Sequence, residues 1–331
     1  MASAVETEKC GSAMAAACDT ANNNIPTTTT TTTTSTTVVS SELSGDDEAA
    51  RAQMVAMIEE VRAKFLEEAA VNPHLYDPTD VDLARTDDWQ VERFILRKKS
   101  IEASLEMIKD TLQWRHELEM PQLKDTDFPE EFFKIGAMFE FEKDLAGNAV
   151  VYLRVRLHRK IKELEKFVKL YMMHIINKAD FAMNGKGLTV VFDCSGAGIS
   201  NLDMDIVWFL VDALIKYYPY GMKNILVHDM PWILSSAWTI IKGWMPEEFR
   251  DKVKFTNKKT ITEYIAAENL PYYLGGTSKR NYHQVPKGCR PAAEIAPEQG
   301  LNEKEVKKML KTFQPFLDEA EEEINVIQSL S

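Results

Sequence analysis

A glycine-containing turn follows an apolar run in the middle of the chain. Residues 188–192 form that run, and Gly196 and Gly198 come shortly after it. A turn of this kind binds a dinucleotide phosphate when a third small residue and a helix start follow directly. Asn201 occupies the position of the third small residue, and the helix-start signals come later. We therefore interpret the glycines as a tight exit from a strand.

Other candidates for catalytic chemistry also have simpler explanations. Asp203 and Asp205 resemble half of an acyl-phosphate nucleophile motif, but capping and the helix dipole favour two carboxylates in a first helical turn. The serines lack a G-x-S-x-G elbow, and the four cysteines lack a catalytic or metal-binding spacing. The six histidines show no metal-ligand spacing either. They are His74, His116, His158, His174, His228 and His283. We therefore expect no enzyme, no metal site and no cofactor.

The most unusual segment of the chain is 231–245. Its apolar residues form two adjacent rows at the i, i+4, i+7, i+11 spacing that stacks side chains along a helix. The rows are Ile233, Ala237, Ile240, Trp244 and Leu234, Trp238, Ile241, Met245. Such a helix is either buried in a core or faces lipid for part of the time, and its tryptophans favour a membrane interface. The candidate gate and membrane-contact residues are Trp232, Leu234, Trp238, Ile241, Trp244 and Met245.

A local excess of positive charge accompanies this segment. Residues 242–259 carry six basic and three acidic side chains, a local charge of +3 in a chain whose net charge is −12. Lys242, Lys252 and Lys254 belong to this basic rim, which suits an anionic bilayer because each nearby cation contributes ~1 kcal/mol. An ordinary solvated face remains the alternative.

Composition limits the remaining functions. The 331 residues are 45% hydrophobic, which is enough for one large or two small globular domains. The acidic balance argues against nucleic-acid binding, because that affinity depends on neutralising phosphates. We find no secretory signal and no apolar stretch of the ~18 residues that a membrane-spanning helix needs. The scattered cysteines fit a reducing compartment, so we expect a soluble, cytoplasmic protein.

Four regions differ in their sequence pattern. Residues 1–48 include an uninterrupted threonine run and predict a disordered, low-complexity leader. Residues 49–123 show helical periodicity, with Ser100 in an N-cap position. In 124–280, strands at 151–158, 188–192, 225–227 and 253–255 alternate with helices, which predicts a parallel α/β unit. Alternation in the first of these strands places Arg154 and Arg156 on an outward face.

The last region, 281–331, predicts a linker and an amphipathic helix. Asn302 and Glu305 form a capping-box pattern, and Pro315 predicts a break or kink. An apolar stripe with heptad-like spacing follows, and it either packs back on the domain or pairs with a protein partner through 301–331. The stripe consists of Val306, Leu310, Phe313, Leu317, Ala320, Ile324 and Ile327.

Several motifs resemble the CRAL-TRIO lipid-binding family, and in particular its phosphatidylinositol-transfer-like members. They occur in family order over about residues 50–278: 88–97 with 114–115, 150–152, 190–193, 217–219, 229–232, 268–271 and 275–277. The resemblance implies an α/β fold with a helical N-terminal subdomain and a mixed or parallel sheet. It also implies an apolar lipid cavity, floored by Val190, Phe192 and Leu226 and closed by a gate helix that matches 231–245.

The resemblance also bears on the lipid headgroup. Phosphatidylinositol-transferring members hold it with an acidic residue after Tyr-Tyr-Pro and with a lysine near the end of the gate. Lys252 matches the lysine, whereas Tyr220 stands at the acidic position. Half of the signature is therefore missing, and another phospholipid or a neutral hydrophobe remains equally open.

We therefore expect a non-enzymatic protein that encloses one phospholipid or other hydrophobic molecule. It is expected to dock transiently on a membrane, with the endoplasmic reticulum surface as one candidate. The alternative is a protein-interaction adaptor that uses the C-terminal stripe and has a vestigial cavity. A nucleotide-dependent enzyme rests only on the glycine turn and ranks last.

Overall fold

The computed structural model describes residues 45–298 and 300–330. The predicted leader therefore lies outside the described residues, except at its end. Helix α1 (Gly45–Val71) begins four residues before the boundary expected at 49. Within the described parts of the chain, no helix is both long enough and apolar enough to cross a membrane.

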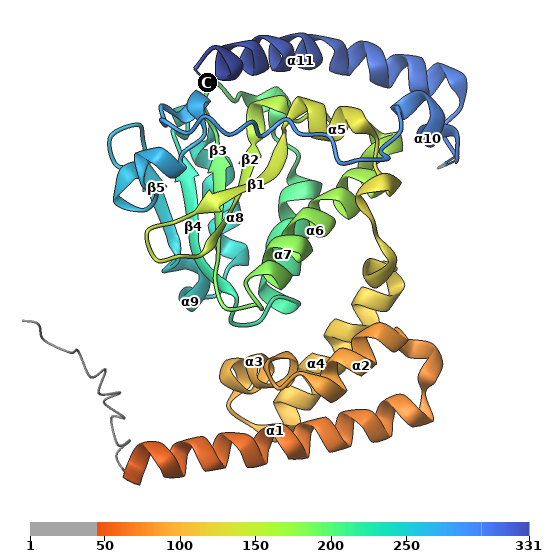
Figure 1. The fold of residues 1–331 in the computed structure, drawn as a ribbon, viewed down its shortest axis with the longest axis vertical. Coiled ribbons are helices and arrows are strands. Elements are labelled where there is room, and N and C mark those ends of the chain that lie inside the picture. The colour runs from red at the N-terminus through yellow and green to blue at the C-terminus, as the bar shows by residue number, and fades with distance from the viewer. Residues whose placement is uncertain (1–44, 299, 331) are drawn as a thin grey trace, which may run out of the picture. The chain divides into compact units, whose positions relative to one another are not determined.

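Four helices form the N-terminal subdomain (Figure 1). Helix α1 packs with α2 (Pro78–Thr86), α3 (Trp89–Lys98) and α4 (Ile101–Glu117) around an apolar core. That core includes Val61, Phe65, Val91, Ile95 and Ile108. The predicted N-cap is confirmed, because the Ser100 hydroxyl accepts a hydrogen bond from the backbone N–H of Ala103 at 3.2 Å.

A buried ion pair joins this subdomain to the α/β region. Both terminal nitrogens of Arg93 in α3 donate to the carboxylate of Asp180 in α6 (Glu165–Ala182), at 2.8 and 3.1 Å. Arg93 Nε donates to the backbone carbonyl of Pro219. These bonds satisfy two charges that would be costly to bury alone.

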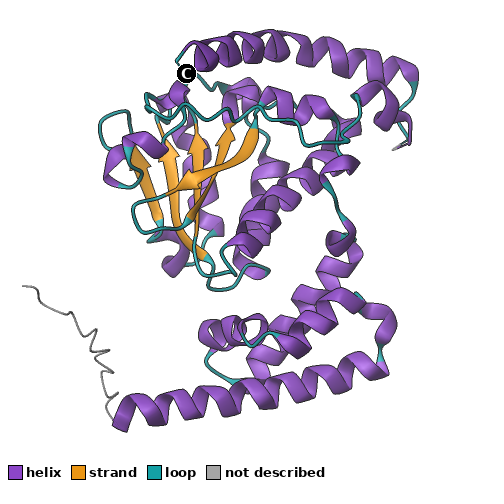
Figure 2. Ribbon diagram, viewed as in Figure 1, coloured by secondary structure: helices purple, strands orange, loops and turns teal. Residues whose placement is uncertain are grey.

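Five strands form one mixed sheet in the order β1-β2-β3-β4-β5 (Figure 2). The strands are β1 (Met138–Lys143), β2 (Ala149–Arg154), β3 (Leu188–Asp193), β4 (Met222–His228) and β5 (Val253–Thr256). Strand β1 pairs antiparallel with β2, and the other neighbours are parallel. Helices α6 and α7 (Met204–Lys216) provide the crossovers between parallel strands, which confirms the predicted α/β unit.

Both faces of the sheet are covered. Successive side chains of a strand point to opposite faces, so each strand contributes residues to two core clusters. Val151, Val190 and Ile225 belong to the core cluster that also contains α6 and α7 residues. Val191 and Leu226 belong to a second cluster on the opposite face. That cluster is completed by residues of the 261–274 segment, Tyr282 and Ile327.

The predicted outward face of the strand at 151–158 is wrong. Strand β2 ends at Arg154, and a 3₁₀ turn (Val155–Leu157) follows. Arg154 is only 2% exposed, and its two terminal nitrogens donate to the carboxylate of Glu323 at 2.9 and 2.6 Å. Arg156 forms a similar pair with Glu319. A distant helix therefore covers the face that alternation alone assigned to solvent.

That helix is α11 (Glu303–Ser329), which runs across the end of the sheet where β2 and β3 finish (Figure 1). It packs against α5 (Glu130–Ile135) and α10 (Ala292–Glu298). Its capping box is confirmed. Of the break or kink predicted at Pro315, the break does not occur, because the helix continues through this residue. Four members of the predicted stripe are buried in the domain: Val306, Phe313, Ala320 and Ile327.

Candidate functional site

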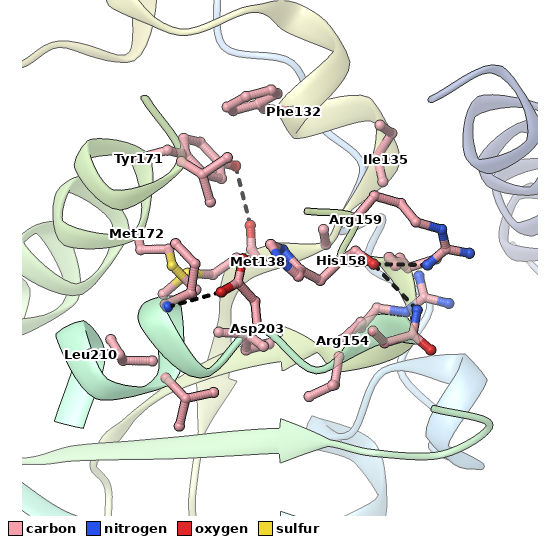
Figure 3. Close-up of a pocket in the computed structure, with 18 of the residues that line it drawn as sticks. Phe132, Ile135, Met138, Arg154, His158, Arg159, Tyr171, Met172, Asp203 and Leu210 are labelled. Carbon is pink, nitrogen blue, oxygen red and sulfur yellow. Dashed lines mark hydrogen bonds and ion pairs between the residues drawn. The ribbon is translucent and has the colours of Figure 1, made fainter. Parts of the chain in front are cut away.

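The larger of two apolar cavities lies between α6, α7 and the ends of β1 and β2. It has a volume of about 140 Å³. Figure 3 shows Phe132 from α5, Tyr171 and Met172 from α6, and Leu210 from α7 around it. Phe313 of α11 also lines this cavity. The space is therefore enclosed by elements from widely separated parts of the sequence.

The second cavity lies beneath α8 (Ser235–Trp244) and has a volume of about 100 Å³. Its lining is almost entirely apolar and comes from α7, α8 and the cavity-facing residues of β3 and β4. Four residues line both cavities, so the two spaces adjoin. They are Val155, Phe192, Leu202 and Val207.

The six predicted gate and membrane-contact residues differ in their exposure. Leu234, Trp238, Ile241 and Met245 line the second cavity and are buried or half-buried. Trp244 is half-buried as well. Among the six predicted gate residues, only Trp232 faces solvent, with 84% of its surface exposed. The outward apolar surface is completed by Ile233 and Ile240, which belong to the other predicted row.

The predicted cavity floor is partly wrong. Phe192 lines both cavities. Val190 lies on the same face of the sheet and is fully buried in the core there. Leu226 lies on the opposite face, because it pairs with Val191, and Ile225 and Val227 face the cavity instead. A continuous apolar run does not show which alternate residues face which layer.

The predicted basic rim divides into two groups. Lys242 is exposed on α8, whereas Lys254 is exposed on β5 in register with Leu226, on the face of the sheet opposite α8. Lys252 is half-buried, its amino group donates to the carbonyl of Met222 at 2.7 Å, and burial together with nearby Lys223 and Arg97 lowers its pKa. Tyr220 packs edge-on against Trp89, with ring centroids 5.9 Å apart.

One end of the larger cavity is polar. His158 Nε2 lies 3.4 Å from Asp203 Oδ2, and Arg159 lines the same end of the cavity (Figure 3). Asn201 also lines the cavity, and its Nδ2 donates to the carbonyl of His158 at 3.2 Å. Burial lowers the pKa of His158. Burial opposes ionisation of Asp203, but hydrogen bonds from Lys160 and His158 keep its pKa below the ordinary value. The sequence interpretation missed this end, although Asp203 was recognised as a cap.

The other sequence motifs have structural roles. Gly196 adopts a φ of +67°, as a tight strand exit requires. Asp203 Oδ1 accepts a hydrogen bond from the backbone N–H of Asp205 at 3.1 Å, which confirms the predicted cap of α7. Within residues 45–298 and 300–330, no group of three or more His, Cys, Asp or Glu side chains is placed to hold a metal ion.

The chain was also compared with known proteins. Residues 134–276 match the sequence model of the CRAL/TRIO domain. A CRAL-TRIO domain-containing protein of Schizosaccharomyces pombe is 29% identical over 242 residues, which cover 70% of this chain and 53% of that protein. The phosphatidylinositol transfer protein CSR1 of Eremothecium gossypii is 28% identical over 256 residues, covering 72% of this chain and 58% of that protein.

The chain thus spans little more than half the length of these two relatives. The crystal structure of Sfh5 superimposes with a TM-score of 0.54 and 16% sequence identity, covering 78% of this chain and 98% of Sfh5. This likeness concerns the fold alone. From the matched sequence model we conclude that residues 134–276 of the chain are a CRAL/TRIO domain.

Proposed function

We propose that this protein is a non-enzymatic carrier that encloses one hydrophobic molecule in the two adjoining cavities. The single observation that carries the proposal is the pair of adjoining apolar cavities, the smaller of which lies beneath α8. An unfilled apolar cavity costs roughly 24 cal/mol per Å³, so the larger one alone costs on the order of 3 kcal/mol. That is a large share of an ordinary folding free energy, and a bound hydrophobe would recover it.

Helix α8 is suited to act as the gate. Its side-chain hydrogen bonds are local: the Ser235 hydroxyl donates to the Trp232 carbonyl and the Thr239 hydroxyl to the Ser235 carbonyl. Among the described residues, no ion pair joins α8 to the rest of the fold, and its inner face makes only apolar contacts. In water, these apolar contacts oppose movement of α8 away from the cavity. They oppose it less at a surface where exposing apolar side chains costs little free energy.

The outward face of α8 supports contact with an anionic membrane. Trp232, Ile233 and Ile240 are exposed there, and Trp238 contacts the half-exposed Phe255 of β5. Exposed Lys242 lies on the same helix. Aromatic and aliphatic side chains flanked by cations are typical of surfaces that bind the membrane interface.

The names of the relatives indicate a class of ligand. One of them is a phosphatidylinositol transfer protein, which supports a lipid as the cargo here. The amino group of Lys252 is already bonded to a backbone carbonyl, and Tyr220 carries no charge that could replace the missing acid. A phosphatidylinositol headgroup site is therefore not part of the proposal.

The adaptor alternative depends on an apolar stripe of α11 that is free to bind a protein partner, and the structure does not leave this stripe free. Its candidate stripe on α11 lies against α5 and the sheet in this structure, with Phe313 in the wall of the larger cavity. No observation in the described residues favours it over the carrier.

Vesicle binding tests the gate surface directly. The double variant Trp232→Ser with Ile240→Ser is expected to reduce sedimentation with phosphatidylcholine–phosphatidylserine vesicles at least about tenfold, because interfacial burial of two large side chains is lost. The matched control is Val55→Ser with Val71→Ser, which removes two exposed apolar side chains from α1.

Native mass spectrometry of the purified chain tests the cavity. We expect one hydrophobic molecule per chain, and transfer of a fluorescent lipid between vesicles that fails in the α8 variant. Protein that is always empty and never exchanges lipid between vesicles would contradict the proposal.

A further inference from the structure

The long helix α11 divides at Pro315 into two halves that are attached to the domain in different ways. We propose that its second half, residues 316–329, is a flap that bends at Pro315 and lifts from the polar end of the larger cavity at an anionic membrane surface. The movement itself is independent of the carrier function, whereas its consequence for a bound hydrophobe rests on that proposed function. Three features carry the proposal: the packing of each half, the proline between them, and the cations that the flap covers.

The first half of α11 is anchored by apolar packing. The structure describes the whole helix, and three of its five buried side chains lie before the proline: Val306, Met309 and Phe313. All three belong to the core cluster that also contains residues of α5 and α10. Pulling them away would expose a large apolar area to water. This half is therefore expected to stay on the domain.

The second half is held by fewer buried apolar side chains and by two arginine–carboxylate pairs. It buries only an alanine and Ile327. The Glu319 carboxylate accepts a hydrogen bond from Arg156 Nη1 at 2.9 Å, and Glu323 accepts two from Arg154. The Arg156–Glu319 pair is the more exposed, with 29% and 36% of the two side chains accessible. Salt and competing anions weaken a pair that is exposed in this way.

Pro315 weakens the helix between the two halves. A proline has no backbone N–H, so the carbonyl of Lys311, four residues earlier, receives no helical hydrogen bond from it. Bending at this position therefore breaks one hydrogen bond fewer than bending elsewhere in α11. The helix runs straight on through Pro315 in the sequence of its backbone bonds, with both halves against the domain. If the second half loses its contacts, we expect α11 to bend here.

The flap covers cations at the polar end of the larger cavity. Arg154, His158 and Arg159 line that end (Figure 3), and the Arg159 guanidinium lies 4.7 Å from the centre of the Phe316 ring. The segment 154–160 carries four cationic side chains besides the histidine. Lifting the flap removes its two carboxylates and its phenyl ring from three arginines of this segment. Phosphates of an anionic bilayer can replace the carboxylates, because a guanidinium group binds both kinds of oxygen with the same fork of donors.

Hydrogen exchange of the full chain, followed by mass spectrometry, tests whether the two halves open separately. Backbone amides of 317–325 are expected to exchange at least about tenfold faster than those of 307–313, because they can open without breaking the core packing of the first half. The terminal residues are left out of the comparison, since helix ends fray. Vesicles of phosphatidylcholine and phosphatidylserine are expected to speed exchange in 317–325 further, whereas pure phosphatidylcholine vesicles are not.

Three variants distinguish a hinged flap from fraying of the helix end. Glu319→Gln removes the exposed pair and is expected to speed exchange in 317–325 about fivefold. Pro315→Ala restores the missing backbone bond and is expected to slow it at least about fivefold. Glu321→Gln removes a neighbouring exposed carboxylate and is the matched control, with no change expected. Circular dichroism verifies that each variant folds.

Transfer of a fluorescent lipid tests the link between the flap and the cavity. Pro315→Ala is expected to slow transfer between anionic vesicles at least about threefold. Its binding to those vesicles is expected to stay unchanged, because the outward face of α8 is intact. Unaltered transfer in a variant whose exchange has slowed would overturn the flap as an opening of the cavity.

The exchange measurement gives two further results that would overturn the flap. One is equal exchange in 307–313 and 317–325, which would mean that α11 opens as a single unit. The other is exchange in 317–325 that neither anionic vesicles nor Pro315→Ala changes. If the unaltered chain transfers no lipid at all, the carrier function is contradicted, while the exchange of α11 still decides whether the flap moves.

Discussion

Asp125 illustrates how single carboxylates fix segments that lack regular structure. It lies in the connection that leads from the helical subdomain to α5, and its Oδ1 lies 2.8 Å from His174 Nε2 of α6. Lys178 donates to both carboxylate oxygens at 2.8 Å. The hydrogen bond with His174 is the main cause that lowers the pKa of Asp125 to about 2, with Lys178 adding to it against the opposing effect of burial.

This lowered pKa predicts how stability depends on acidity. A carboxylate whose pKa falls on folding stabilises the protein above its unfolded pKa of about 3.9 and loses that contribution as the pH falls through about 2. Asp125→Asn is expected to lower the free energy of unfolding by roughly 1–2 kcal/mol at about pH 5, after allowance for solvent screening. Urea denaturation should show this difference shrinking between about pH 4 and pH 2.

Asp110→Asn provides the control, because Asp110 is exposed on α4 and should have little effect. A difference between the Asp125 variant and the unaltered protein that stays constant down to about pH 2 would contradict the assignment.

At the scale of elements, α11 completes the α/β domain. Glu323 accepts hydrogen bonds from Arg154, from the Tyr282 hydroxyl at 2.8 Å and from His283 Nε2 at 3.0 Å. Burial opposes its ionisation, but hydrogen bonds from His283 and Arg154 keep the pKa of Glu323 well below its ordinary value. These bonds attach the helix to the end of β2 and to the segment before α10.

Removing the shared carboxylate should therefore be costly. Glu323→Ala removes both hydrogen bonds of the buried Arg154 to a carboxylate and leaves only its longer ion pair with Glu319, at 3.7 Å. It is expected to destabilise the protein by about 3 kcal/mol in chemical denaturation. Glu322→Ala removes the adjacent exposed carboxylate and is expected to change stability by less than about 0.5 kcal/mol. Equal effects of the two substitutions would show that the buried pair does not hold α11.

At the scale of the whole molecule, ligand binding and folding are linked. The larger cavity is formed by residues from Phe132 to Phe313, so its shape exists only when the α/β region and α11 are assembled. A hydrophobe that fills it binds the folded chain and not the unfolded one. Occupancy should therefore raise the free energy of unfolding by mass action.

Delipidation provides the measurement of this linkage. Protein loaded with a hydrophobe at 100 times its dissociation constant should be more stable than the empty protein by about 2.7 kcal/mol. For a chain of this size the melting temperature should rise by roughly 4 °C in calorimetry. An unchanged melting temperature in protein that native mass spectrometry shows to be loaded would place the ligand outside the cavity.

The sequence by itself determined the features that depend on neighbouring residues. The caps at Ser100, Asp203 and Asn302 and the strand at β3 were predictable because each arises within a few residues of chain. The order of the motifs likewise predicted the CRAL/TRIO domain and the fold class. Helix capping and hydrophobic periodicity depend on nearby residues, so both can be predicted without knowledge of the tertiary structure.

Only the tertiary structure decided what depends on distant contacts. Arg154 is buried because Glu323, 169 residues away, lies over it, and Leu226 faces the second layer because of its register with Val191. The inward face of α8 and the polar end at His158 are likewise set by packing against other elements. A cavity is the space that remains after long-range packing, and no local pattern in the sequence records it.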